Sequence, residues 1–148
     1  MAVSTGRVGY VFLIKGKLYG WRLSRQAAAS PEEGARFAKS WITLMRPEVV
    51  VTEKITGQCR KGAKVKAIIE AIARVAAEEP LYDIAVARTR TFPNKFAEAE
   101  VLAERFPDLR PRLPKPRKLW HSEPRNTTIF EALALALVAI DNEGAGTE

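Results

Sequence analysis

Apolar residues at the start of the chain follow the pattern of a β-hairpin. Residues 8–14 are apolar, Lys15-Gly16-Lys17 has the composition of a turn, and residues 18–23 alternate apolar with small or polar positions. Further along, the run Val49-Val50-Val51 predicts a short strand that is buried on both faces. Another strand is predicted over residues 82–87.

Apolar positions at helical spacing predict four helices after the hairpin. The first begins where Ser30 supplies a capping hydroxyl and Pro31 occupies the first helical position, and Pro47 ends it. The other three predicted helices cover residues 64–79, 95–106 and 127–140. This order predicts an α/β fold with a mixed sheet, which is antiparallel at the start and parallel in the middle.

The length of 148 residues fits one domain, and 47% apolar residues suffice for a buried core. We expect this domain to cover residues 1–142. Within it, residues 107–125 are rich in proline and basic residues and predict a semi-rigid surface segment. Residues 143–148 are expected to form a flexible tail.

The composition excludes several classes of protein. A single cysteine cannot form an internal disulfide and indicates a reducing, cytoplasmic setting. One cysteine and one histidine do not suffice for a Cys/His zinc site, so any metal would be held by carboxylates. No apolar run approaches the ~20 residues of a membrane span, and the first residues lack the pattern of a secretory signal.

The chain is basic, with 24 Lys and Arg against 17 Asp and Glu and a net charge of +7. Nucleic acid is therefore the first candidate partner, although many basic proteins bind none. Cations gather where the helix over 64–79 begins, which opposes the helix dipole and suggests either a bound anion or an ordinary solvated patch. The candidate nucleic-acid-binding residues are Arg60, Lys61, Lys64, Lys66, Arg117, Lys118 and Arg125.

Two glutamates occupy positions where a carboxylate is costly. Glu53 directly follows a predicted buried strand, and Glu131 lies in a helix that is apolar nearly all round. Two carboxylates that meet at a strand end are the minimum for a Mg²⁺ or Mn²⁺ site, and Glu123 could reach the same site. The alternative is that Glu53 and Glu131 each pair with a lysine or arginine, and that Glu123 caps a helix or is a solvated loop acid.

The order of elements and two acidic motifs resemble the ribonuclease H-like fold, and more closely the RuvC-type Holliday junction resolvases and RuvC-like bacterial proteins of unassigned function. Val49-Val50-Val51-Thr52-Glu53 is similar to the second acidic motif of that family. The segment from Thr128 to Ala134, which contains Glu131, is similar to its terminal acidic helix. Lys95 is placed like the lysine that resolvases carry on the helix after the fifth strand.

This resemblance implies a Mg²⁺- or Mn²⁺-dependent endonuclease that acts on branched or structured DNA as a homodimer. Glu53 and Glu131 would hold the metal with help from Glu123, and Lys95 would be catalytic. Two departures stand against it: no Asp ends the first strand, and Thr128 stands where the family has a second acid in the closing helix. Two alternatives therefore stay open, a nucleic-acid-binding module that does not cut and a protein-interaction domain.

Overall fold

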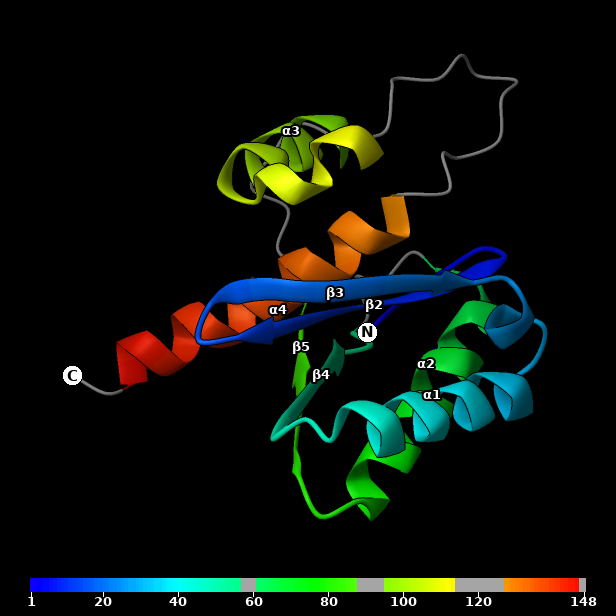
Figure 1. The fold of residues 1–148 in the computed structure, drawn as a ribbon. Coiled ribbons are helices and arrows are strands. Elements are labelled where there is room, and N and C mark those ends of the chain that lie inside the picture. The colour runs from blue at the N-terminus through cyan, green and yellow to red at the C-terminus, as the bar shows by residue number, and fades with distance from the viewer. Residues whose placement is uncertain (57–60, 88–94, 114–126, 147–148) are drawn as a thin grey trace, which may run out of the picture.

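Strands from the first part of the chain form one antiparallel sheet, and strands from its middle form a second, parallel sheet (Figure 1). In this computed structural model the first sheet has the order β1-β2-β3 and the second pairs β4 with β5. The strands are β1 (Ala2–Ser4), β2 (Arg7–Ile14), β3 (Lys17–Ser24), β4 (Val49–Glu53) and β5 (Tyr82–Val86). The predicted hairpin and both later strands are thus confirmed.

The structure describes residues 1–56, 61–87, 95–113 and 127–146, and for residues 95, 96 and 142–146 it describes the backbone only. All four predicted helices are present, with boundaries that differ by up to six residues. The helices are η1 (Gln26–Ala28), α1 (Pro31–Met45), α2 (Ala63–Glu78), α3 (Lys95–Arg105), η2 (Pro107–Arg112) and α4 (Thr127–Gly146).

The strands form two sheets where the sequence predicts one mixed sheet. β1 is only three residues long, which is too short to build an extended parallel ladder with β4. The two sheets nevertheless lie side by side, because the Met1 α-amino group donates a hydrogen bond of 2.7 Å to the Val51 carbonyl oxygen on β4. The mixed α/β class is confirmed, and the division into two sheets lies between β4 and β1, which is the shortest strand.

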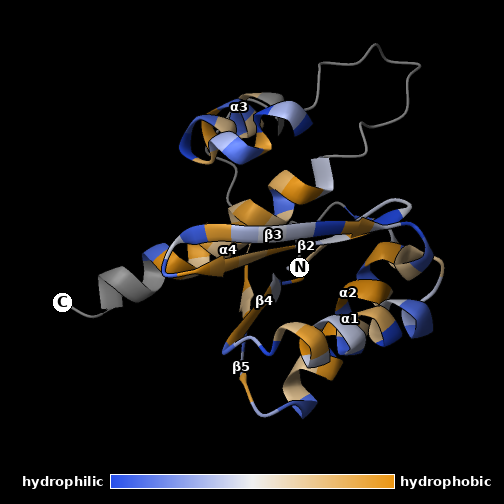
Figure 2. Ribbon diagram, in the orientation of Figure 1, coloured by the Kyte–Doolittle hydropathy of each residue, from blue (hydrophilic) through white to orange (hydrophobic). Residues whose placement is uncertain are grey.

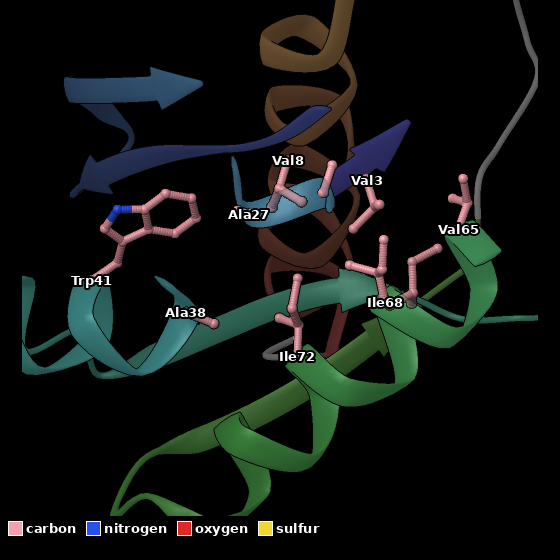
Figure 3. Packing of buried hydrophobic residues seen from close by; sticks show 10 residues of the cluster. Val3, Val8, Ala27, Ala38, Trp41, Val65, Ile68 and Ile72 are labelled. Atoms are coloured by element: carbon pink, nitrogen blue, oxygen red, sulfur yellow. The ribbon is translucent and has the colours of Figure 1, made fainter. Parts of the chain in front are cut away.

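Helices α1 and α2 cover one face of the sheets. The Ser30 hydroxyl accepts a hydrogen bond from the Glu33 backbone N–H, and Pro31 opens α1, as the sequence predicts. Figure 3 shows the core beneath these helices, where Val3 and Val8 of the sheet meet side chains of α1 and α2. The labelled members of this core are Val3, Val8, Ala27, Ala38, Trp41, Val65, Ile68 and Ile72.

Helix α4 packs on the opposite face, so the sheets lie between two layers of helices. Its hydropathy is high along most of its length (Figure 2). Leu133 and Leu135 are almost completely buried in two neighbouring clusters, one of which α3 also joins. None of the described helices is both long and apolar enough to span a bilayer.

Three details differ from the sequence expectations. Val49 is 36% exposed because it is the first residue of β4, so that strand is not buried on both faces along its whole length. In the predicted surface segment, η2 is anchored by Leu109, which is fully buried. Helix α4 continues through Gly146, into the residues expected to form a tail.

Candidate functional site

Glu53 is the last residue of β4, and its side chain is 4% exposed. The three valines before it favour an extended backbone, which carries the chain inward between the helical layers. The strand ends at Glu53, which pairs with Val86 at the end of β5. The next residue, Lys54, donates its backbone N–H to the Val86 carbonyl oxygen. The carboxylate is therefore held at the carboxyl edge of the parallel pair, where ligands bind in open α/β sheets.

Glu131 reaches the same place from α4, and its side chain is 2% exposed. Its neighbours in the helix are buried against the sheets and α3, so the carboxylate cannot reach water by turning along the helix. We call Glu53 and Glu131 the acidic pair. The sequence predicts that these two side chains meet. In the structure both of them contact one shared residue, which is described next.

Lys61 provides this contact. Its ammonium group lies 3.2 Å from Glu53 Oε1 and also forms an ion pair and hydrogen bond with Glu131 Oε1. It donates a further hydrogen bond of 2.6 Å to the carbonyl oxygen of Val3, the middle residue of β1. The Lys61 side chain is 21% exposed, so its stem runs inward from the surface while its partners are buried. One cation therefore links β1, β4 and α4.

Two hydroxyl groups lie next to this cluster in the chain. Ser4, the last residue of β1, forms a buried hydrogen bond of 2.5 Å with Thr128, which lies one turn before Glu131. Thr128 stands where the resemblance leads one to expect a second acid in the closing helix, and Ser4 opens the segment before which the resemblance leads one to expect an Asp. The two hydroxyl groups hydrogen-bond to each other and carry no charge.

The Met1 α-amino group is buried beside the cluster. Burial lowers its pKa from 8.0 to about 5, and the negative charge of Glu131 offsets part of that shift. The amine is therefore neutral at pH 7, and the Lys61 ammonium carries the positive charge that faces the acidic pair. Two carboxylates then share one cation, and the buried Glu131 Oε2 has no hydrogen-bond partner in the described part of the chain.

These residues do not fit a two-ion metal centre. Among the residues that the structure describes, no group of three His, Cys, Asp or Glu side chains converges. The ammonium of Lys61 already contacts both carboxylates, and hydroxyls occupy the places at Ser4 and Thr128. A single divalent ion between Glu53 and Glu131 would have to displace Lys61, with the Val3 carbonyl oxygen as a further donor.

The other predicted site residues are distributed as follows. Lys64 is exposed and Lys66 half-buried in the first turn of α2, whose capping residue Gly62 provides no side-chain cap. Lys95 is the first residue of α3, and its side chain lies outside the described part of the chain. The remaining predicted site residues, Arg60, Arg117, Lys118, Glu123 and Arg125, also lie outside the described residues.

The sequence prediction missed the role of Lys61 in this cluster. It counted Lys61 among the cations that would contact phosphate, and it found no cation at helical spacing from Glu131. The partner is instead 70 residues away along the chain. The available signal was the position of Lys61 directly before a helix start, where a cation opposes the dipole unless it has an acidic partner.

Comparisons of the chain with models of known protein families, with curated proteins and with solved structures find no match in any of the three.

Proposed function

We propose that this chain is a nucleic-acid-binding domain of the ribonuclease H-like type, similar to RuvC-like proteins, that binds branched or structured DNA without cutting it. One observation carries the proposal: the Lys61 ammonium lies between the two carboxylates that metal-dependent cleavage would require. Lys61 offsets part of the negative charge of that pair from within the protein, and the chain as a whole keeps a net charge of +7, which suits an anionic partner.

The order and direction of the strands support the ribonuclease H-like assignment. An antiparallel β1-β2-β3 sheet lies beside a parallel β4-β5 pair, with helices between β3 and β4 and between β4 and β5. The Met1 hydrogen bond to Val51 places β1 next to β4. The acidic pair comes from the end of β4 and from the closing helix, which are the two positions named by the resemblance.

A binding assay tests this proposal. Fluorescence anisotropy with labelled four-way junction, duplex and single-stranded DNA should give an affinity that falls linearly with the logarithm of salt concentration. Glu53→Gln and Glu131→Gln should leave this affinity unchanged, since neither carboxylate is exposed. A chain that binds no nucleic acid at any salt concentration would contradict the proposal and favour a protein-interaction domain in the cytoplasm.

The second candidate is a Mg²⁺- or Mn²⁺-dependent endonuclease. Glu131 Oε2 favours it, because this atom is buried without a hydrogen-bond partner among the described residues and is available to a cation. A bound divalent ion would supply Lewis-acid stabilisation of the phosphate. In this candidate Glu123 would still help to hold the metal and Lys95 would still be catalytic. The enzyme would act as a homodimer, as the resemblance implies.

A cleavage assay separates the two candidates. The intact chain is incubated with labelled junction DNA and Mn²⁺ or Mg²⁺, beside Glu131→Gln as the matched control. No cleavage with either metal supports the binding module. Metal-dependent cleavage that Glu131→Gln abolishes would replace it with the endonuclease.

A further inference from the structure

One face of the β2–β3 hairpin is covered only in part by the helices that the structure describes. Val11 and Leu13 of β2 point to the side packed against α4, so Tyr10, Phe12 and Ile14 point to the other side. Tyr10 stacks on Trp41 of α1, with ring centroids 4.8 Å apart. In Figure 1 the hairpin continues past this point, and its tip lies on the far side from α1 and α2.

A β-bulge adds an aromatic residue to this face. Phe12 pairs with Gly20 and Leu13 pairs with Leu18, so Tyr19 is an extra residue on β3. Since Leu18 packs toward α4, alternation turns Lys17 and Tyr19 to the opposite side. Arg22, the partner of Tyr10, lies on that side as well. We call the surface of Phe12, Ile14, Lys17, Tyr19 and Arg22 the hairpin face.

Two large side chains of the hairpin face are exposed to solvent. Tyr19 is 63% exposed and Ile14 41%, while Phe12 is half-buried. Phe12 lies opposite Gly20, and a Cβ atom built on Gly20 meets no atom of the described residues within 4 Å. The described part of the chain therefore leaves room for a flat ligand over this part of the sheet.

The charged residues of the hairpin itself are all basic. Residues 1–31 contain no Asp or Glu, and Glu32 is the first acid of the chain. Lys17 and Arg22 on the face are exposed, as are Lys15 and Arg25 at its two ends. Aromatic groups beside exposed cations suit a ligand that combines flat rings with phosphates.

We propose that the hairpin face binds unpaired nucleotides, with a base stacked on Tyr19 beside Phe12 and with the phosphates held by Lys17 and Arg22. The inference rests on the proposed function and specifies that this surface binds the unpaired nucleotides of a branched DNA. Stacking needs an exposed π-face and no sequence-specific hydrogen bond, so binding here is tolerant of sequence. Duplex DNA, whose bases are already stacked, gains nothing from Tyr19.

The test measures anisotropy of the intact chain with a labelled oligothymidylate of about 12 nucleotides, a length that one such surface accommodates. Tyr19→Ala is expected to weaken binding about tenfold, as for the loss of one base–aromatic stack. Tyr19→Phe keeps the ring and should stay within about twofold of the original chain. Gly20→Glu, which has room for its side chain, should weaken binding at least as much as Tyr19→Ala by placing a carboxylate on the face.

Tyr82→Ala is the matched control, because Tyr82 is 77% exposed on β5 and lies outside the hairpin face. It should change the affinity by less than about twofold, and circular dichroism should show every variant folded. If Tyr19→Ala binds as Tyr82→Ala does, or if the chain binds duplex DNA but no single strand, the hairpin-face proposal is overturned and the proposed function stands. If the chain binds no nucleic acid of any kind, the proposed function itself fails.

Discussion

At the scale of single residues, the charge balance of the buried cluster depends on Lys61. Lys61→Met keeps most of the apolar stem and removes the ammonium that faces Glu53 and Glu131. Two buried carboxylates then lose the Lys61 cation that they share, and we expect a loss of about 3 kcal/mol in the free energy of unfolding. Urea denaturation of the variant and the original chain measures this difference.

The double variant Lys61→Met/Glu131→Gln is the control for this prediction. It removes one cation and one carboxylate together, so it should recover more than half of the lost stability. Equal stability of Lys61→Met and the original chain would mean that Lys61 does not neutralise the acidic pair. The same single variant also bears on the second candidate function: added Mn²⁺ should raise its Tm if the pair accepts a divalent ion.

The residues of the candidate site could be predicted only in part. Glu53 and Glu131 stand out in the sequence because each is a charge within an apolar segment. The Lys61 ion pair and the Ser4–Thr128 hydrogen bond each join residues far apart along the chain, 70 and 124 positions respectively. Such contacts follow from how β1, β4 and α4 pack, and no local pattern encodes that packing.

At the scale of elements, the close approach of α1 and α2 depends on Gly34. A Cβ atom at this position would lie 2.9 Å from Ile68 Cγ2 and 3.2 Å from the Ala27 carbonyl oxygen. Ile68 is 1% exposed and has little room to move. Gly34→Val should therefore push the helices apart and cost about 2 to 3 kcal/mol, although valine has a better helix propensity than glycine.

Gly20→Ala is the control for this prediction, because a Cβ atom there meets no atom of the described residues within 4 Å. Its effect on the free energy of unfolding, measured by urea denaturation, should stay within about 0.5 kcal/mol. A Gly34→Val chain as stable as Gly20→Ala would show that α1 and α2 are not in tight contact at this point.

Boundaries of elements were predictable where a cap or turn residue fixes them. The Ser30 hydroxyl and Pro31 start α1 where the sequence predicts, since both act within one turn of backbone. The division into two sheets was not predictable, because it depends on how far β1 extends along β4. The bulge at Tyr19 was also missed, since simple alternation over residues 18–23 hides one extra residue.

At the scale of the whole molecule, the cations of the hairpin and the buried acidic pair belong to different parts of the fold. The hairpin and its flanks carry cations without acids up to residue 31, whereas Glu53 and Glu131 are buried between the helical layers. A phosphate backbone that approaches the hairpin meets cations on the hairpin itself, whereas the carboxylates of the acidic pair are buried. Binding and any chemistry at the pair are separable functions, which is why carboxylate variants and hairpin variants can test them independently.

The Met1 amine joins the two sheets, so its titration should affect the stability of the whole 148-residue chain. Its pKa is about 5 in the folded state, against an ordinary value of 8.0 for an α-amino group. Between these two values the unfolded chain binds more protons, so the free energy of unfolding should rise with pH from 5 to 8, by at most about 4 kcal/mol. The same region also holds Glu131, Glu53 and Lys61. These residues are present both in the original chain and in the acetylated chain with which it is compared below.

Urea denaturation at several pH values between 5 and 8 measures this slope for the original chain and for the same chain with an acetylated N-terminus. Acetylation removes the titrating amine but keeps one N–H that can donate to the Val51 carbonyl oxygen. The acetylated chain should therefore lose most of the pH dependence in this window. If both chains show the same slope, the titration arises elsewhere, and the link between the sheets contributes no pH dependence to the fold.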